Sequence, residues 1–301
     1  MTVKNTKFFS AERDYHGTTI TALSATGQLQ RKDQYGPFTP GFVEFPHCCE
    51  YRSQFEDDAA NAEYGVKAAL EMEKVILAEG PDTVGAVIVE PITAGGGVIP
   101  PPAGYYETIQ ELCKNIMASN QTIVTMAKGV ASGYAAISCT VTTEEVFNMF
   151  KEDPSDNMSY FRDISTFGGC TAGPAAAIEN MKIIEEENLL ENVTKMGDYA
   201  MERMLALKEK HAMIGDVRGK GLFLGIELVE DRETKVPMDE SVSIAIAADC
   251  MKQGVIIGRT NRSFTALNNT LCLAPALIAT KDDIDEIMDS IDAAIGRISE
   301  S

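Results

Sequence analysis

Apolar and polar positions along the chain predict helices and strands in alternation. Residues 84–89 (VGAVIV) form a continuous apolar run, which is typical of a strand buried on both faces of a parallel sheet, and residues 137–141 predict another buried strand. Residues 59–79 place alanine, leucine, methionine and isoleucine on one face and charged residues on the other, which predicts a helix. Strands and helices that alternate in this way indicate the α/β fold class.

Further elements follow from the same periodicities and from capping residues. Thr142 with Glu145, and Thr280 with Asp283, have the spacing of a capping box and predict helix starts. We expect other strands at residues 7–10, 122–125, 214–219, 221–228, 254–257 and 270–273, and other helices at 18–27, 106–117, 174–212 (broken near Asn188) and 241–253. Residues 28–55 have little periodicity and predict a long ordered loop, a kind of segment that often contributes to function.

The character of the chain changes near residue 185, inside its longest helical stretch. Beyond that point short strands alternate with helices around what we expect to be a smaller sheet. We therefore predict a large domain at residues 1–185 and a small C-terminal domain at residues 186–301.

Composition limits the classes of partner. The 301 residues are 45% hydrophobic and 24% charged, with a formal net charge of −19, so neither nucleic acid nor an anionic membrane surface is an expected partner. No apolar run has the length of a membrane span, and MTVKNTKFFS lacks the apolar region of a signal peptide. The 7 cysteines are scattered without a CxxC pair. They indicate reduced thiols in a cytoplasmic protein, and His47-Cys48-Cys49 lacks the second cluster that a metal site would need.

Lys128 is the candidate for covalent chemistry. It follows a β-forming run (residues 122–125) and stands among small residues, with Gly129, Ala131, Ser132 and Gly133 after it. An amine with apolar and small neighbours and no charged one suits attack on an aldehyde, because loss of water favours its neutral form. The alternative is an ordinary surface lysine between a strand and a loop.

Gly219, Gly221 and Gly225 are similar to a dinucleotide-binding fingerprint, but their spacing does not match it. Position 224 is leucine, and the segment lies between two predicted strands, whereas the fingerprint joins a strand to a helix. We therefore interpret these glycines as a tight turn.

Five stretches in this order resemble the class III aminotransferases of the fold-type I pyridoxal-phosphate family. They are Tyr15-His16-Gly17, Glu90-Pro91 with GGG and PPPAGYY after it, TMAKG around Lys128, STFGG at 165–169, and VRGKGLFLGIEL. The sequences of the segments DYHGTTITALSATG and ASGYAAISCTVT most resemble those of the enzymes that use ω-amines and pyruvate, with taurine among the amines. The resemblance covers essentially the whole chain. It implies a large domain with a mostly parallel sheet, incomplete here, and a smaller C-terminal α/β domain.

The resemblance also implies roles for particular residues. Lys128 matches the lysine that holds pyridoxal 5'-phosphate as a Schiff base and moves the substrate's proton, and Tyr15 matches the aromatic residue that stacks on the cofactor ring, although a core tyrosine is an equal alternative. Glu90 matches a glutamate near the substrate. Thr166 matches a residue that reaches the cofactor phosphate of a neighbouring subunit, which implies a homodimer with shared sites.

The arginine that binds the carboxylate of pyruvate or alanine is expected at Arg259, with Arg262 as the competitor because the register is open. His16 is expected to give structural support. The reaction implied is transfer of an amino group from an ω-amine such as taurine to pyruvate, which leaves an aldehyde and alanine.

Two family features are missing from the sequence. The family places a strand with an Asp-Glu-Val signature before the lysine, and its aspartate pairs with the cofactor's ring nitrogen, but no Asp or Glu lies between Glu111 and Lys128. No Ser/Gly-rich phosphate cradle precedes Lys7. We therefore expect the chain to be shortened relative to the family at its start and internally. The alternative function is a catalytically impaired remnant that acts, if at all, through the dimer interface, and a related decarboxylase or aminomutase is a weaker one.

Overall fold

The computed structural model describes residues 5–55, 63–117, 122–151, 155, 160–264 and 266–300. The chain forms two compact units, which we call unit 1 (Met1–Ala118 with Asn192–Ser301) and unit 2 (Ser119–Glu191). The division into residues 1–185 and 186–301 stays a prediction. In the described part of the chain, no helix combines the length and the apolar character that crossing a membrane requires.

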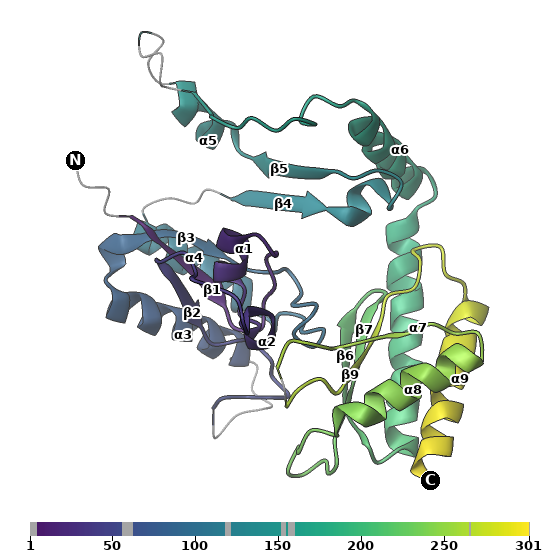
Figure 1. Ribbon diagram of the computed structural model, residues 1–301. Helices are drawn as coiled ribbons and strands as arrows, with labels where there is room; N and C mark the ends of the chain where they lie inside the picture. Colours follow the sequence, from purple (N-terminus) through teal and green to yellow (C-terminus); the bar gives the residue numbers. More distant parts are fainter. Residues whose placement is uncertain are drawn as a thin grey trace. The chain divides into compact units, whose positions relative to one another are not determined.

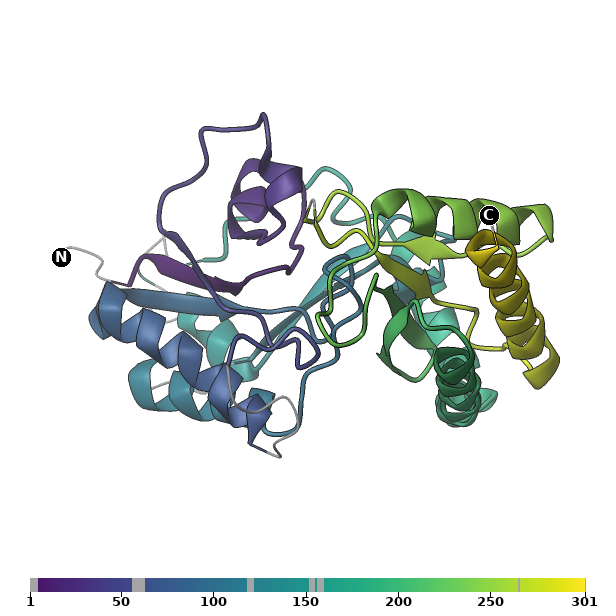
Figure 2. The ribbon, with the colours of Figure 1, turned by 90° about the horizontal axis from the view of Figure 1, so that it is seen from below.

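A three-stranded parallel sheet organises the N-terminal part of unit 1 (Figure 1). Its strand order is β2-β1-β3, with β1 at Lys7–Ala11, β2 at Phe42–Phe45 and β3 at Val84–Ile88. Two long helices, α3 (Tyr64–Glu79) and α4 (Tyr105–Met117), pack on one side of the sheet, and α1 (Ile20–Ala25) lies on the other (Figure 2). The short helix α2 (Leu29–Lys32) follows α1.

Large buried side chains hold this part together. Phe9 and Phe45 of the sheet, Met72 and Ile76 of α3, and Tyr105 of α4 are all less than 3% exposed. Burial of an apolar side chain of this size stabilises the fold by roughly 2 kcal/mol. This core fixes the ends of β1 and β3, where the candidate site begins.

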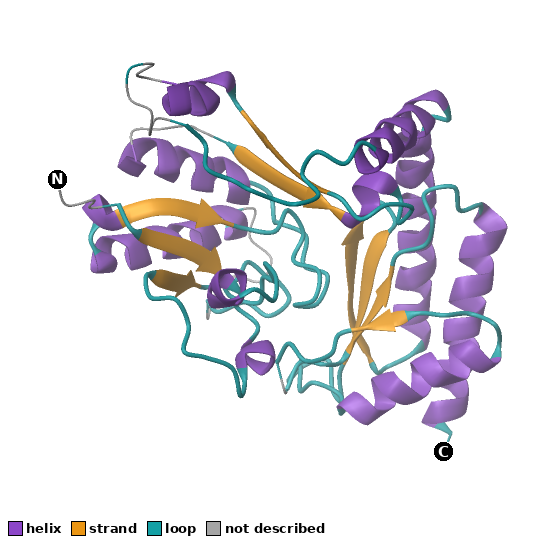
Figure 3. Ribbon diagram, turned by 45° about the horizontal axis from the view of Figure 1, so that its top comes forward, coloured by secondary structure: helices purple, strands orange, loops and turns teal. Residues whose placement is uncertain are grey.

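The C-terminal part of unit 1 is a four-stranded antiparallel sheet covered by helices on one face (Figure 3). The strand order is β6-β7-β9-β8, with β6 at Ile214–Lys220, β7 at Phe223–Leu228, β8 at Gly258–Arg259 and β9 at Thr270–Leu273. The covering helices are α7 (Leu189–Lys210), α8 (Glu240–Lys252) and α9 (Lys281–Ser299).

Unit 2 is built around a hairpin and has almost no core. Strand β4 (Ile123–Ala127) pairs antiparallel with β5 (Ser138–Thr142), and a 3-10 turn at Lys128–Ala131 follows β4. The helices are α5 (Glu144–Asn148), continued by a 3-10 turn at Met149–Lys151, and α6 (Ala172–Glu186). Among the described residues of this unit, the buried ones are Ala131, Gly173, Ala177 and Leu189.

Most predicted elements are confirmed, including the helix break at Asn188 and the capping box of Thr280 with Asp283. The tight turn between β6 and β7 is also confirmed, with Gly219 and Gly221 at positive φ. The fold class is confirmed as well, since helices are combined with sheets, one of which is parallel.

Several sequence predictions are wrong. Residues 28–55 are not one loop, because they contain α2 and β2, whose four residues are too few for a clear periodicity. The predicted strand at 254–257 is irregular backbone, and the strand starts at Gly258. The cap of α5 is Thr143, whose side chain accepts a hydrogen bond from the Val146 N–H. The first residues of the helix predicted at 59–79 lie outside the described residues, and α3 is described from Tyr64.

Burial was mispredicted for two strands. In β3 the buried residue is Val84, and no residue of β5 is buried. A strand is covered on both sides only when its sheet continues beyond it and helices pack on both faces. In the described residues β3 pairs with β1 alone and β5 pairs with β4 alone, so both are edge strands.

Candidate active site

Tyr15 and Glu90, which are 75 positions apart in the sequence, lie in direct contact. The Glu90 carboxylate accepts hydrogen bonds from the backbone N–H of Tyr15 and, at 2.8 Å, from that of Ala94. Glu90 follows the end of β3, and Tyr15 follows the neighbouring strand β1 in the same direction. The carboxyl ends of parallel strands are where α/β sheets place ligand-binding groups.

Asp14 is buried between the same two loops and connects them through hydrogen bonds. Its carboxylate accepts hydrogen bonds from the Glu90 N–H at 2.8 Å and from the Thr93 hydroxyl, and only 1% of the residue is exposed. Burial raises the pKa of Asp14 to about 7, and the nearby Glu90 carboxylate adds to the rise while the hydrogen bonds oppose it. Asp14 therefore fixes Glu90 and titrates near neutrality.

Tyr15 and His16 have different surroundings. The Arg31 guanidinium lies over the Tyr15 ring, 4.9 Å from its centroid, which is a cation–π contact. The backbone N–H of His16 donates to the Thr26 hydroxyl at 3.0 Å, and burial lowers the pKa of His16 to about 4. A neutral, partly buried imidazole is consistent with the structural role expected of His16.

The two candidate arginines differ in their partners. Arg259, on β8, donates from Nη1 to the Glu240 carboxylate at 2.6 Å. Arg262 is exposed, has a φ of 53°, and forms no ion pair within the described residues. The next residue, Ser263, donates from its hydroxyl to the Gly95 carbonyl, so this segment lies against the glycine-rich loop that follows Glu90.

Buried charges connect the two parts of unit 1 beneath this loop. Glu227 on β7 pairs with Arg52 and with Arg218, each at 2.6 Å. Arg218 also donates from Nη2 to the Gly97 carbonyl at 2.6 Å, and the Arg13 guanidinium donates to the Gly96 carbonyl. These bonds fix the position of the GGG loop relative to the C-terminal sheet.

Lys128 directly follows β4, in unit 2, and begins a tight turn. Its φ is 53°, a left-handed conformation that non-glycine residues rarely adopt and that is found more often at functional sites. The Asn180 amide on α6 donates to the carbonyls of Gly129 at 3.1 Å and Val130 at 3.0 Å, which holds the turn. The side chain of Lys128 is exposed, so unit 2 alone does not provide the water-excluded setting expected for this amine.

Thr166, also in unit 2, lies in an exposed turn. The Gly168 N–H donates to the Ser165 carbonyl at 3.0 Å across this turn. Lys128 and Thr166 thus belong to one unit, and Tyr15, Glu90, Arg259 and Arg262 to the other.

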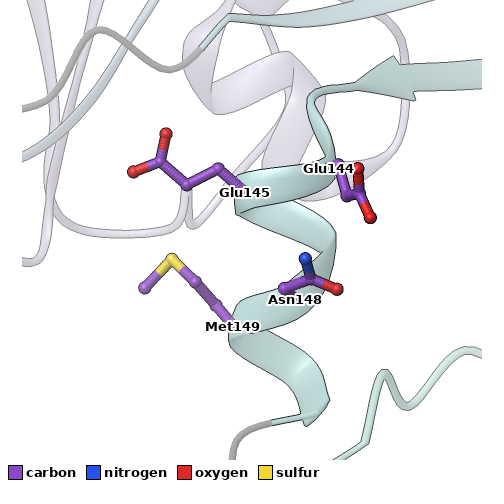
Figure 4. Close-up of a pocket in the computed structure, with 4 residues that line it drawn as sticks. All are labelled: Glu144, Glu145, Asn148 and Met149. Carbon is purple, nitrogen blue, oxygen red and sulfur yellow. The ribbon is translucent and has the colours of Figure 1, made fainter.

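Two cavities contain none of the predicted site residues. One, of about 670 Å³, opens along α5 and is lined by Glu144, Glu145, Asn148 and Met149 (Figure 4). The second, of about 440 Å³ in unit 1, is lined by residues 49–51, 99–102, 216–218 and Lys235.

Sequence reasoning missed three residues that shape the site: Asp14, Arg31 and Asn180. Asp14 stands in the quoted DYHG motif, and a carboxylate one residue before a candidate ligand contact was an available signal. Arg31 and Asn180 act through contacts between distant segments or elements, and no local pattern marks them.

The comparisons with known proteins all indicate the same protein family. The sequence model of the family described as aminotransferase class-III matches residues 2–118 and 117–295. The hypotaurine/taurine–pyruvate aminotransferase of Paracoccus denitrificans is 57% identical, over 98% of this chain and 69% of its own length. The taurine–pyruvate aminotransferase of Bilophila wadsworthia is also 57% identical, over 99% of this chain and 70% of its own.

Solved structures agree. A Bacillus anthracis aminotransferase superimposes with a TM-score of 0.91 at 34% identity, over 98% of this chain and 70% of that chain. An amine transaminase from an uncultivated Pseudomonas species, solved in its pyridoxal-phosphate-bound form, gives a TM-score of 0.90 at 25% identity, over 98% of this chain and 70% of that chain.

The matches also show a difference in length. The match to the Paracoccus denitrificans protein runs over 319 residues, more than the 301 of this chain, so at least 18 residues of that relative have no counterpart here. The two ranges matched by the family model overlap at residues 117–118, next to the point where unit 1 ends at Ala118 and unit 2 begins at Ser119. Family matches on both sides of that point, together with the relatives, show that the chain belongs to the class III aminotransferases, a family of pyridoxal-phosphate-dependent enzymes.

Proposed function

We propose that this protein moves an amino group from an ω-amine, taurine or hypotaurine, to pyruvate, giving an aldehyde and alanine. The observation that carries the proposal is the 57% identity over 98% of the chain to the hypotaurine/taurine–pyruvate aminotransferase. At this level of identity the ordered motifs around Tyr15, Glu90, Lys128 and Thr166 support the same chemistry.

The described residues fit pyridoxal phosphate in part. Lys128 offers an accessible primary amine beside glycines 129 and 133, at which an added Cβ would meet no atom within 4 Å, so the turn leaves room for a bound group. The ring nitrogen lacks its expected partner, because the sequence has no Asp or Glu between Glu111 and Lys128. When bound, the cofactor supplies the electron sink for amino transfer.

The chain's own residues have distinct parts in this proposal. The Lys128 amine would hold the cofactor and move the substrate proton at Nζ, and the Tyr15 ring would contact the cofactor. Glu90, oriented by the Tyr15 and Ala94 N–H groups and by Asp14, would contact the substrate.

An arginine fork binds the substrate carboxylate. Arg259 would have to leave its ion pair with Glu240 to do so, whereas Arg262 has no such pair to break within the described residues. Loss of the arginine that binds the carboxylate should raise the KM for pyruvate about tenfold or more, since hydrogen bonds between charged groups contribute roughly 1.5–3 kcal/mol. Comparison of Arg259→Ala with Arg262→Ala in this assay decides between the two arginines. A KM for pyruvate equal to the wild-type value in both variants would exclude both.

We further propose a cytoplasmic homodimer. The 7 cysteines are free, which favours a reducing compartment. In unit 2 the side chains of Tyr134, Ile164 and Phe167 are at least 83% exposed, an amount of uncovered apolar surface that a second copy of the chain would remove from water. Phe167 is next to Thr166, the residue proposed to reach the partner's cofactor.

Absorption spectroscopy tests the proposal. The purified chain with pyridoxal phosphate should show a visible band that shifts when taurine is added and returns with pyruvate. Lys128→Ala should show neither the band nor the shift, while Lys182→Ala, an exposed lysine on α6 of the same unit, should behave like the wild type. A band of equal strength in wild type and Lys128→Ala would contradict the assignment of Lys128.

A further inference from the structure

Arg13 combines deep burial with an unusual backbone conformation. It lies in the loop that follows β1, one residue before Asp14, and only 2% of it is exposed. Its φ is 70°, a left-handed conformation that is costly for a residue with a side chain and that is found more often at functional sites. The Arg13 N–H donates to the Gly27 carbonyl at 3.1 Å, which holds the backbone in this conformation.

The guanidinium of Arg13 has few partners for a buried cation. Its Nη2 donates to the Gly96 carbonyl, and the Phe264 ring centroid lies 5.7 Å from its Cζ. Its Nε and Nη1 are buried and have no hydrogen-bond partner in the described part of the chain. Buried polar groups in native proteins are nearly always hydrogen-bonded, so these two atoms indicate a missing partner.

Two carboxylates of the surrounding buried cluster pair with other arginines. Glu227 pairs with Arg52 and Arg218, each at 2.6 Å, and Asp216 pairs with Arg218 at 2.8 Å. Among the residues that the structure describes, Arg13 forms no ion pair. Burial lowers the pKa of Arg13, but a guanidinium in a protein keeps its proton. These three arginines therefore face two carboxylates, and the charge that lacks a counter-ion is that of Arg13.

A second buried group without a partner lies at the same place. The Thr270 hydroxyl, on β9, has no hydrogen-bond partner within the described residues. Gly97 marks the position. A Cβ added to it would lie 3.0 Å from Nη2 of both Arg13 and Arg218, and 3.7 Å from Oγ1 of Thr270. Two cationic donors and one hydroxyl thus converge beside the GGG loop, and donors of this kind bind anions strongly.

We propose that Arg13 and Thr270 bind a small monovalent anion, of the size of chloride, beneath the GGG loop. Neither of the two cavities described above is lined by these residues, which favours an ion of one atom over a phosphate or a carboxylate. The anion supplies the missing negative charge and accepts hydrogen bonds from the free N–H groups of Arg13 and from the Thr270 hydroxyl. It takes no part in amino transfer, so the site is separate from the proposed function.

Crystallography of the 301-residue chain in sodium bromide tests the site directly. Bromide replaces chloride, and its anomalous scattering distinguishes it from water. The expected result is an anomalous peak at hydrogen-bonding distance from the Arg13 guanidinium and the Thr270 hydroxyl. A water molecule at this position without an anomalous peak, or a carboxylate of another chain paired with Arg13, would overturn the proposal.

Thermal unfolding in solution provides a second test. The probe is sodium chloride, compared with sodium gluconate at the same ionic strength, because gluconate is too large for the site. The rise in Tm from gluconate to chloride should be about 2–4 °C larger in the wild type than in Arg13→Met, since an anion that binds only the folded chain stabilises it.

Two further variants make this comparison specific. Thr270→Val keeps the shape of the side chain and removes only the unpartnered hydroxyl, so it should fold and should lose at least half of the chloride effect. Arg203→Met is the matched control, because Arg203 has its own partners in Asp285 and Asp289, and it should retain the full effect. A chloride effect in Thr270→Val and Arg13→Met equal to that of the wild type would overturn the proposal, and if Arg13→Met does not fold, Thr270→Val alone decides.

Discussion

Asp14 controls the geometry around Glu90. It is buried between two loops, and it accepts hydrogen bonds from the Glu90 N–H and the Thr93 hydroxyl. Its pKa of about 7 lies well above the ordinary 3.8, so the folded chain retains this proton over a pH range in which the unfolded chain releases it. A group of this kind stabilises the fold most at low pH, and its contribution falls as the pH rises through the folded-state pKa.

Asp14→Asn should remove this dependence. Between about pH 4 and 7 the wild-type free energy of unfolding should fall relative to that of the variant, by an amount on the order of 4 kcal/mol or less. Denaturant titrations across this range measure the difference, and Asp163→Asn, an exposed position in unit 2, is the control. A difference between wild type and Asp14→Asn that stays constant with pH would show that Asp14 does not titrate in this window.

At the scale of elements, local patterns predicted most helices and strands but not what surrounds them. The capped helix α9 and the turn between β6 and β7 follow from nearby residues, namely Thr280 with Asp283 and Gly219 with Gly221. The burial of β3 and β5 could not be predicted in this way, because it depends on which strands lie beside them. For the same reason Tyr15 and Glu90 could be proposed from motifs, whereas Asp14, Arg31 and Asn180 were seen only through contacts between segments distant in sequence.

The turn after β4 depends on one amide from a helix. Asn180→Ala removes the hydrogen bonds to the Gly129 and Val130 carbonyls, and hydrogen exchange in residues 128–134 should become faster. Asn192 is a matched control, because its amide bridges the Leu277 and Ala279 carbonyls in unit 1 in the same manner. Asn192→Ala should loosen residues 277–279 and leave the Lys128 turn unchanged, and an unchanged turn in Asn180→Ala would show that other contacts hold it.

At the scale of the whole molecule, the two units differ in how much they bury. Unit 1 has two extensive apolar cores. In the described part of unit 2, the buried residues are Ala131, Gly173, Ala177 and Leu189. Local stability follows buried apolar contact, so unit 2 should open more readily than unit 1. Limited proteolysis of the isolated chain should therefore cut first between residues 122 and 188, and a first cut inside α3 or α9 would contradict this.

The central claim is that this chain transfers an amino group through Lys128. The most direct measurement supplies taurine labelled with heavy nitrogen, unlabelled pyruvate and pyridoxal phosphate to the purified protein, and follows the label by mass spectrometry. The account predicts labelled alanine with the wild type and none with Lys128→Ala. Absence of labelled alanine from the wild-type protein, or its equal formation by the Lys128→Ala variant, would contradict it.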